Sequence, residues 1–122
     1  MSYSSFEYSN LRTSSRQIGA DGEIQISADV RNTSARQGDE VVEMYVAHEG
    51  SKIERPKEEL KGFKRVKLGP GRKTTVNFVL KASDLAYWSV DKGAWDVERD
   101  QVRVMIGSSS ADIHLQRIAT VR

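Results

Sequence analysis

The sequence of 122 residues contains no cysteine. This absence excludes disulfide bonds, thiolate nucleophiles and zinc sites with cysteine ligands, but it leaves the cellular compartment open. Long apolar runs are also missing, because no stretch approaches the roughly 20 apolar residues that a membrane-spanning helix needs. The first residues lack a basic segment followed by an apolar one, so we expect no signal peptide within this chain.

An excess of charge of one sign is missing as well. The 19 Lys and Arg residues are nearly balanced by 17 Asp and Glu residues, which leaves a formal net charge of +2. This charge is too small and too scattered for the basic stripe of a nucleic-acid-binding protein, so we expect neither a nucleic-acid nor a membrane partner. The length corresponds to a single hydrophobic core, and we predict one domain over residues 1–122.

Apolar residues recur at every second position, as in a strand with one buried face. This alternation is clear over residues 23–31, 73–81 and 101–107, and weaker over 6–13, 60–68 and 113–120. Residues 41–46 are β-branched or aromatic without strict alternation, which favours a central strand covered on both faces. Glycine-rich and proline-rich turns separate the segments. We therefore predict an all-β fold, an antiparallel β-sandwich of fibronectin type III or immunoglobulin type with about seven strands.

Three segments between the predicted strands have distinct expectations. Residues 82–87 can form one helical turn capped by Ser83 or Asp84. Residues 48–59 are mostly charged, and we interpret them as a solvated loop. The glycosylation signal at Asn32 fits an exposed loop and matters only in a host that glycosylates proteins.

Residues with catalytic chemistry are present but scattered. His48 and His114 are the only histidines, and 66 positions separate them, so we expect both to lie in a loop or on the surface. The carboxylates show no metal-ligand spacing and no paired arrangement around a sugar-sized cleft. The serines at 108–110 have no histidine motif beside them. We therefore predict no catalytic residue, no metal and no cofactor.

Large aromatic side chains are the remaining candidates for binding. Tyr87, Trp88 and Trp95 offer flat faces that stack on sugars or pack in an interior. Adjacent strand residues point to opposite faces, so we expect Tyr87 or Trp88 to pack inside the sandwich. Both interpretations, packing and surface binding, stay open for these three residues.

Several motifs in the same order are similar to one known domain. They are YSSFEYSNL at residues 3–11, GDEVVEMYV at 38–46, RPKEELKGFKRV at 55–66, LGPG at 68–71, DLAY at 84–87 and GSSSADI at 107–113. Together they resemble the fibronectin type III-like domain at the C-terminal end of family 3 glycoside hydrolases, the β-glucosidases and their relatives. The resemblance covers nearly the whole chain.

The chain also departs from the family pattern. After Trp95 it has Arg99 and Asp100 where the family usually has Pro-Gly, so this turn differs. Met1 stands where a leucine normally joins the domain to the preceding one, so the chain looks like an excised domain.

The resemblance implies a module without catalytic residues, because the nucleophile and the acid/base residue of the family lie in other domains. It implies packing on those catalytic domains, with the loop from Lys52 to Lys61 facing them. The candidate contact residues are Arg55, Pro56, Leu60, Lys61 and Phe63. The family also implies a periplasmic or extracellular location.

Two functions follow from these observations. The first is a structural module that stabilises the catalytic domains of a β-glucosidase-like hydrolase. The alternative is a module that binds insoluble polysaccharide or lignin through exposed Trp88, Trp95 or Tyr87.

Overall fold

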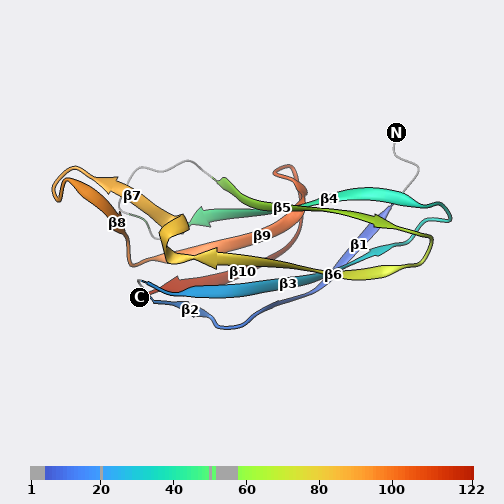
Figure 1. Cartoon of the computed structure of the whole chain (residues 1–122), viewed down its shortest axis with the longest axis horizontal. Coiled ribbons are helices and arrows are strands. Elements are labelled where there is room, and N and C mark those ends of the chain that lie inside the picture. Colours follow the sequence, from blue (N-terminus) through green and yellow to red (C-terminus); the bar gives the residue numbers. More distant parts are fainter. Residues whose placement is uncertain (1–4, 20, 50, 52–57) are drawn as a thin grey trace.

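The structure is a computed structural model that describes residues 5–19, 21–49, 51 and 58–122. This part of the chain contains ten strands and one short 3-10 helix (Figure 1). The elements are β1 (Phe6–Thr13), β2 (Gln17–Ile18), β3 (Glu23–Asn32), β4 (Gly38–His48), β5 (Glu59–Leu68), β6 (Lys73–Lys81), η1 (Ala82–Leu85), β7 (Ala86–Ser89), β8 (Ala94–Val97), β9 (Gln101–Ser109) and β10 (Asp112–Val121).

The strands form two main sheets and a separate hairpin. One sheet has the order β1-β3-β6, the other has the order β2-β10-β9-β4-β5, and β7 pairs with β8. All pairs are antiparallel except the two-residue pairing of β2 with β10. The prediction of an all-β, fibronectin type III-like sandwich is confirmed, and each of the seven predicted strands is present. The structure adds β2, β7 and β8, which are too short to show an alternating pattern.

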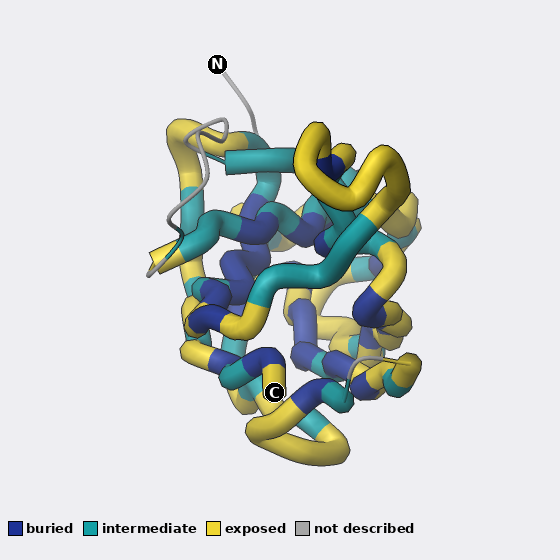
Figure 2. The backbone as a smooth tube through the Cα atoms, turned by 90° about the vertical axis from the view of Figure 1, so that its left-hand side faces the viewer, coloured by how far each residue is buried: buried dark blue, intermediate teal, exposed yellow. Residues whose placement is uncertain are grey.

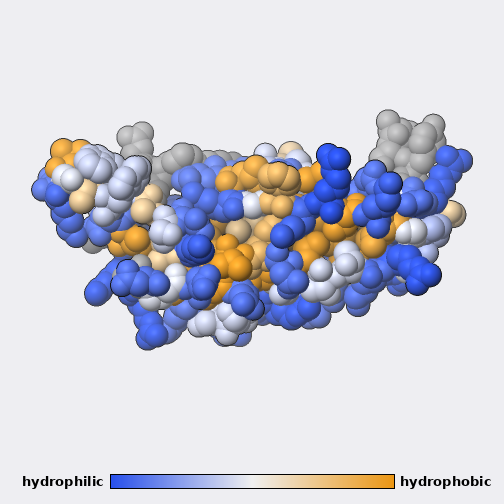
Figure 3. All heavy atoms as spheres, in the orientation of Figure 1, coloured by the Kyte–Doolittle hydropathy of each residue, from blue (hydrophilic) through white to orange (hydrophobic). Residues whose placement is uncertain are grey.

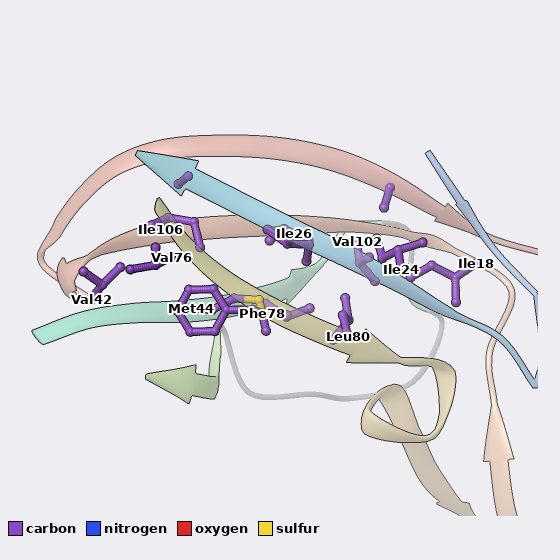
Figure 4. Packing of buried hydrophobic residues seen from close by; sticks show 14 of the residues in the cluster. Ile18, Ile24, Ile26, Val42, Met44, Val76, Phe78, Leu80, Val102 and Ile106 are labelled. Atoms are coloured by element: carbon purple, nitrogen blue, oxygen red, sulfur yellow. The ribbon is translucent and has the colours of Figure 1, made fainter. Parts of the chain in front are cut away.

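The core lies between the inner faces of the two main sheets. In β3 and β6, alternate residues point inward, and in β4 and β9 the same alternation supplies the opposite layer. Figure 4 shows these side chains meeting in one cluster, which includes Ile24, Ile26, Met44, Phe78, Leu80, Val102 and Ile106. In Figure 2, the buried segments of the backbone lie mainly toward the middle of the molecule, while most of the exposed segments lie around its outside. Because the core uses one face of each sheet, the outer faces and the loops are left to form contacts with other molecules.

The position of β4 differs in part from its prediction. This strand lies between β9 and β5, so β9 rather than β4 is the middle strand of its sheet. Val42, Met44 and Val46 are buried, whereas Val41, Glu43 and Tyr45 on the outer face are half-buried. The isolated domain therefore covers only one face of β4 completely.

The predicted helical turn is confirmed as η1, between β6 and β7. Its N-cap residue is Lys81, so the expectation that Ser83 or Asp84 occupies this position is wrong. Asp84 lies in the first turn, and its carboxylate accepts a hydrogen bond of 2.9 Å from the backbone N–H of Lys81. Ala82 and Leu85 bury their side chains under the turn. Within the described chain there is no helix with the length and apolar character that crossing a bilayer requires.

Asn32 ties the two sheets together at one end of the sandwich. Its side-chain Nδ2 donates hydrogen bonds to the carbonyl oxygens of Arg36 (2.7 Å) and Leu68 (2.9 Å). Its backbone N–H donates to the Arg72 carbonyl, and its own carbonyl accepts from the Gly71 N–H. Asn32 is fully buried, so the expectation of an exposed loop at this glycosylation signal is wrong.

Asp29 holds the three-stranded sheet together on its outer face. Its carboxylate accepts hydrogen bonds from Thr75 Oγ1 on β6 (2.7 Å) and from Asn10 Nδ2 and Arg12 on β1 (3.1 and 3.3 Å). The bond from Thr75 is the main cause that lowers the pKa of Asp29 to about 2, and the bond from Asn10 comes next. A single buried carboxylate therefore connects both edge strands to β3.

Replacing Asn32 tests the hydrogen bonds that join it to Arg36, in the β3–β4 connection, and to Leu68, at the end of β5. Asn32→Asp removes the side-chain N–H groups that donate to two carbonyl oxygens and places an acceptor against them, so we expect the free energy of unfolding to fall by about 3 kcal/mol. Urea denaturation measures this loss. The matched control is Asn77→Asp, because exposed Asn77 accepts a hydrogen bond from Ser27 Oγ, which a carboxylate also accepts. An equal loss in both variants would contradict this role of Asn32.

The Asp29 network predicts a specific pH dependence. Because the folded-state pKa is lowered to about 2 from about 3.9 in unfolded chains, the ionised carboxylate stabilises the fold above pH 4. This contribution is lost as the pH falls from about 4 to 2. Asp29→Asn should flatten the dependence of the melting temperature on pH in this window, whereas Asp91→Asn, on an exposed turn, should leave it unchanged. A variant curve parallel to that of the parent would rule out the network as the cause.

Candidate functional site

Strand β5 carries the described part of the predicted contact segment. Leu60, Lys61 and Phe63 lie at its start, whereas Arg55 and Pro56 lie outside the residues that the structure describes. β5 is an edge strand of the five-stranded sheet and pairs only with β4 among the described strands. Its exposed positions are therefore accessible from one side of the molecule.

A β-bulge at Lys61 changes the direction in which the side chains of the contact segment point. The register places Leu60 opposite Tyr45 and Gly62 opposite Met44, so Lys61 is the extra residue. The bulge allows both Leu60 and Phe63 to lie on the outer face. Gly62 points inward, where a Cβ atom would lie 3.0 Å from the ring of Phe78. The glycine of the motif therefore permits close packing of β5 on the core.

Four apolar side chains gather on the outer face of this sheet. In the pairing of β5, β4 and β9, Leu60 lies opposite Tyr45, Tyr45 lies opposite Met105, and Phe63 follows in the next outward row. Leu60 and Phe63 are 48% and 66% exposed. We call Tyr45, Leu60, Phe63 and Met105 the outer-face patch.

The surroundings of the outer-face patch are polar and carry charges of both signs. Arg65 and Lys67 are exposed on the same face of β5 beyond Phe63, whereas Glu43 lies opposite Phe63 on β4. The Tyr45 hydroxyl donates a hydrogen bond of 3.0 Å to Glu43 Oε2. Burial of the phenol, followed by this hydrogen bond, raises the pKa of Tyr45, so its ring stays neutral at physiological pH. Elsewhere on the surface, Figure 3 shows a band of hydrophobic atoms along the middle of the molecule, in the region between β5 and β6 of Figure 1, with hydrophilic atoms on both sides of it.

The three predicted aromatic residues lie on the β7–β8 hairpin, which projects from one end of the sandwich (Figure 1). Trp88 lies opposite Trp95, and the two rings meet edge to face with centroids 5.6 Å apart and planes 82° apart. Trp88 is 53% exposed and Trp95 is 69% exposed. The adjacent residue Tyr87 is half-buried on the opposite hairpin face and does not belong to the core cluster.

The expectation that Tyr87 or Trp88 packs inside the sandwich is therefore wrong. Leu80, Ala82 and Leu85 fill the core where β6 ends, and the chain then leaves the sandwich through η1. The hairpin closes through Gly93, whose φ of 61° suits glycine, and an ion pair of 2.8 Å joins Lys92 to Asp96. Both indoles are thus held on a defined arm outside the core.

Lys61 from the predicted contact segment and Trp95 from the predicted aromatic group lie close together in the structure. An open hollow of about 540 Å³ is lined by Lys61 from the contact segment and by Trp95 from the hairpin, together with Ser83, Asp84 and Ala86. A second group, around Trp88, lines a different hollow with Tyr87, Ser89, Val90 and Asp91. Lys61 therefore belongs with Trp95 rather than with the outer-face patch.

The two histidines have different environments. His48 is a correction to the sequence analysis, because its side chain is only 5% exposed and its Nδ1 lies 2.9 Å from Asp100 Oδ2. The other oxygen of Asp100, Oδ1, is buried and makes no hydrogen bond in the described structure. His114 is partly exposed, as expected for a surface residue, and stacks on Tyr8 with ring centroids 4.2 Å apart.

These groups do not form a recognisable catalytic centre. Ser108 donates a hydrogen bond to Asp112, and His114 Nε2 contacts the same carboxylate, so the histidine is not placed to activate the serine hydroxyl. Over the described ranges, no group of three or more His, Cys, Asp or Glu side chains is arranged to hold a metal ion. What this geometry provides is surfaces for binding: the outer-face patch and the hairpin.

Comparison with known proteins agrees with this architecture. Residues 40–110 match the family model of the fibronectin type III-like domain, and the chain belongs to this family. It is 43% identical over 93% of its length to a β-glucosidase of Kluyveromyces marxianus and 36% identical over 99% to thermostable β-glucosidase B of Acetivibrio thermocellus. The crystal structure of a GH3 β-glucosidase from Bifidobacterium adolescentis superimposes on 99% of the chain, with a TM-score of 0.90 and 35% identity.

These matches cover only a small part of each relative. The chain spans 13% of the Kluyveromyces enzyme, 16% of the Acetivibrio enzyme and 18% of the Bifidobacterium chain. The chain is thus similar to the fibronectin type III-like module of family 3 glycoside hydrolases, a non-catalytic part of these β-glucosidases.

Proposed function

We propose that this chain packs on the catalytic domains of a family 3 β-glucosidase-like hydrolase and stabilises them during carbohydrate degradation. The observation that carries the proposal is the outer-face patch, which places Leu60 and Phe63 in water on a strand whose other exposed side chains are charged. In the relatives, a module of this kind occupies less than one fifth of the chain, so hydrolase domains on the same polypeptide are available as partners.

Burial of the patch supplies a driving force for this packing. A fully buried Leu or Phe side chain contributes about 1.5–3 kcal/mol relative to the exposed state. Leu60 and Phe63 are about half to two thirds exposed, so covering both contributes roughly 2–3 kcal/mol. This energy is sufficient to shift the stability of an attached domain measurably, because native proteins are only marginally stable.

The charges beside the patch indicate the chemistry of the partner surface. Arg65 and Lys67 are exposed on the face of β5 that carries Phe63. An apolar partner surface with acidic residues at its rim would pair with these side chains and favour one orientation. The same basic side chains oppose pairing between the β5 edges of two copies, because like charges would be brought together.

The alternative function is attachment to insoluble polysaccharide or lignin through the hairpin aromatics. The exposure of Trp88 and Trp95 favours it, since both indoles are accessible. Their planes, however, are 82° apart, so only one of the two rings can lie flat against a planar polymer surface. The geometry therefore supports packing through the outer-face patch more strongly than attachment to a flat polymer.

A hybrid enzyme tests the packing. This chain would replace the corresponding domain of the Kluyveromyces marxianus β-glucosidase, to which it is 43% identical. The double variant Leu60→Ser, Phe63→Ser should lower the temperature of half-inactivation of the hybrid by at least about 3 °C, because the apolar contact is lost. β-Glucosidase activity after heating is the measurement.

Two controls separate packing from folding. Val79→Ser removes an apolar side chain that is 46% exposed on β6, away from the patch, and should leave the hybrid unchanged. In the isolated 122-residue chain, the double variant should leave the urea midpoint nearly unchanged, since both side chains are already exposed. If the double variant were as heat-stable as the parent hybrid, the packing proposal would be wrong.

A further inference from the structure

A trough runs past the exposed indole of Trp95. The hollow of about 540 Å³ described above shares Ser83, Ala86 and Trp95 with a second hollow of about 350 Å³. The second hollow adds Asp21, Asp96 and Val97 to the lining. Because three residues belong to both hollows, they are two parts of one surface, which we call the Trp95 trough.

The walls of the Trp95 trough combine one flat apolar face with groups that form hydrogen bonds. Trp95 supplies the apolar face, and it is 69% exposed. Asp84 and Asp96 supply carboxylate acceptors, and Lys61 supplies an ammonium donor. Donors and acceptors therefore lie around a single aromatic ring.

Two of the four charged side chains that line the trough form ion pairs within the domain. Lys61 Nζ lies 2.9 Å from Glu59 Oε2, and Lys92 Nζ lies 2.8 Å from Asp96 Oδ2. The hydrogen bond from Lys92 lowers the pKa of Asp96, so this carboxylate is ionised at neutral pH and accepts hydrogen bonds. Asp21 and Asp84 add two further carboxylates to the lining. A neutral ligand with many hydroxyl groups can donate hydrogen bonds to these carboxylates, whereas an anionic ligand would be repelled by them.

We infer that the Trp95 trough binds one or two pyranose units of a soluble, neutral oligosaccharide. The C–H face of a pyranose ring stacks on the Trp95 indole, as apolar surfaces do on aromatic faces. The sugar hydroxyls donate to Asp84 and Asp96 and accept from Lys61. A trough of this volume lies in the range of small-ligand sites, roughly 300–1,000 Å³.

The inference assigns different roles to the two tryptophans. Trp88 does not line the trough, although it lies opposite Trp95 in the hairpin and touches it edge to face. Trp88 contacts the Trp95 ring from the side, and the sugar contacts only Trp95 of the two tryptophans. This site goes beyond the proposed packing function, because the outer-face patch includes neither tryptophan.

Nuclear magnetic resonance titration of the 122-residue chain tests the site. The chain contains two tryptophans, so its nitrogen–proton correlation spectrum holds two indole resonances, and each single variant assigns one. Cellobiose and laminaribiose are the probes. We expect saturable shifts at the Trp95 indole N–H and at the Ser83 and Ala86 amides, with smaller shifts at β1. Sorbitol, a polyol without a ring face, should produce none of them.

Matched variants decide the outcome. Trp95→Ala should raise the dissociation constant at least about tenfold, whereas Trp88→Ala should change it less than threefold. The dispersion of each spectrum shows whether the variant is folded. Absence of saturable shifts with either disaccharide would overturn the inference, and so would shifts centred on Trp88 or equal weakening in both variants. These results do not depend on the heat stability of the hybrid enzyme. The oligosaccharide site and the packing on catalytic domains can therefore be rejected independently of each other.

Discussion

The hydrogen bonds of Asn32 set the relation between the two sheets. The β3–β4 connection and the β5–β6 turn both pass from one sheet to the other, and this one residue bonds to carbonyl oxygens of both. Without cysteine, the chain has no covalent link that could do the same. The bond to the Leu68 carbonyl holds the end of β5, and the register of β5 on β4 places Phe63 on the outer face.

The core and the surfaces available for function are two consequences of one alternating pattern. Inward residues of β3, β4, β6 and β9 fill the space between the two main sheets with one apolar cluster. The outer face at β5 and the projecting β7–β8 hairpin remain accessible. One surface is apolar with basic residues beside it, which suits another protein domain. The other places a single indole, Trp95, among hydrogen-bonding groups, which suits a sugar.

The sequence predicted features that depend on local pattern, since alternation located seven strands. The structure adds the reason for the glycine in the motif at residues 107–113, because a Cβ at Gly107 would lie 2.1 Å from the Asp112 carbonyl oxygen. Features that depend on distant residues were missed. His48 and Asp100 are 52 positions apart, and no spacing rule indicates that they form a buried pair. The expectation that Tyr87 or Trp88 packs inside the sandwich was wrong, because Leu80 and Leu85 fill the core before the hairpin begins. The hollow lined by Lys61 and Trp95 was missed for the same reason, because these residues are distant in the sequence.

The central claim is that the outer face of β5 is covered by the catalytic part of a hydrolase. Hydroxyl-radical footprinting with mass spectrometry tests it most directly, by comparing the isolated chain with the same chain inside the hybrid β-glucosidase. The account predicts that Phe63, 66% exposed in the isolated domain, is oxidised there and protected in the hybrid, while Val79 is oxidised equally in both. Equal oxidation of Phe63 in both samples would contradict the account.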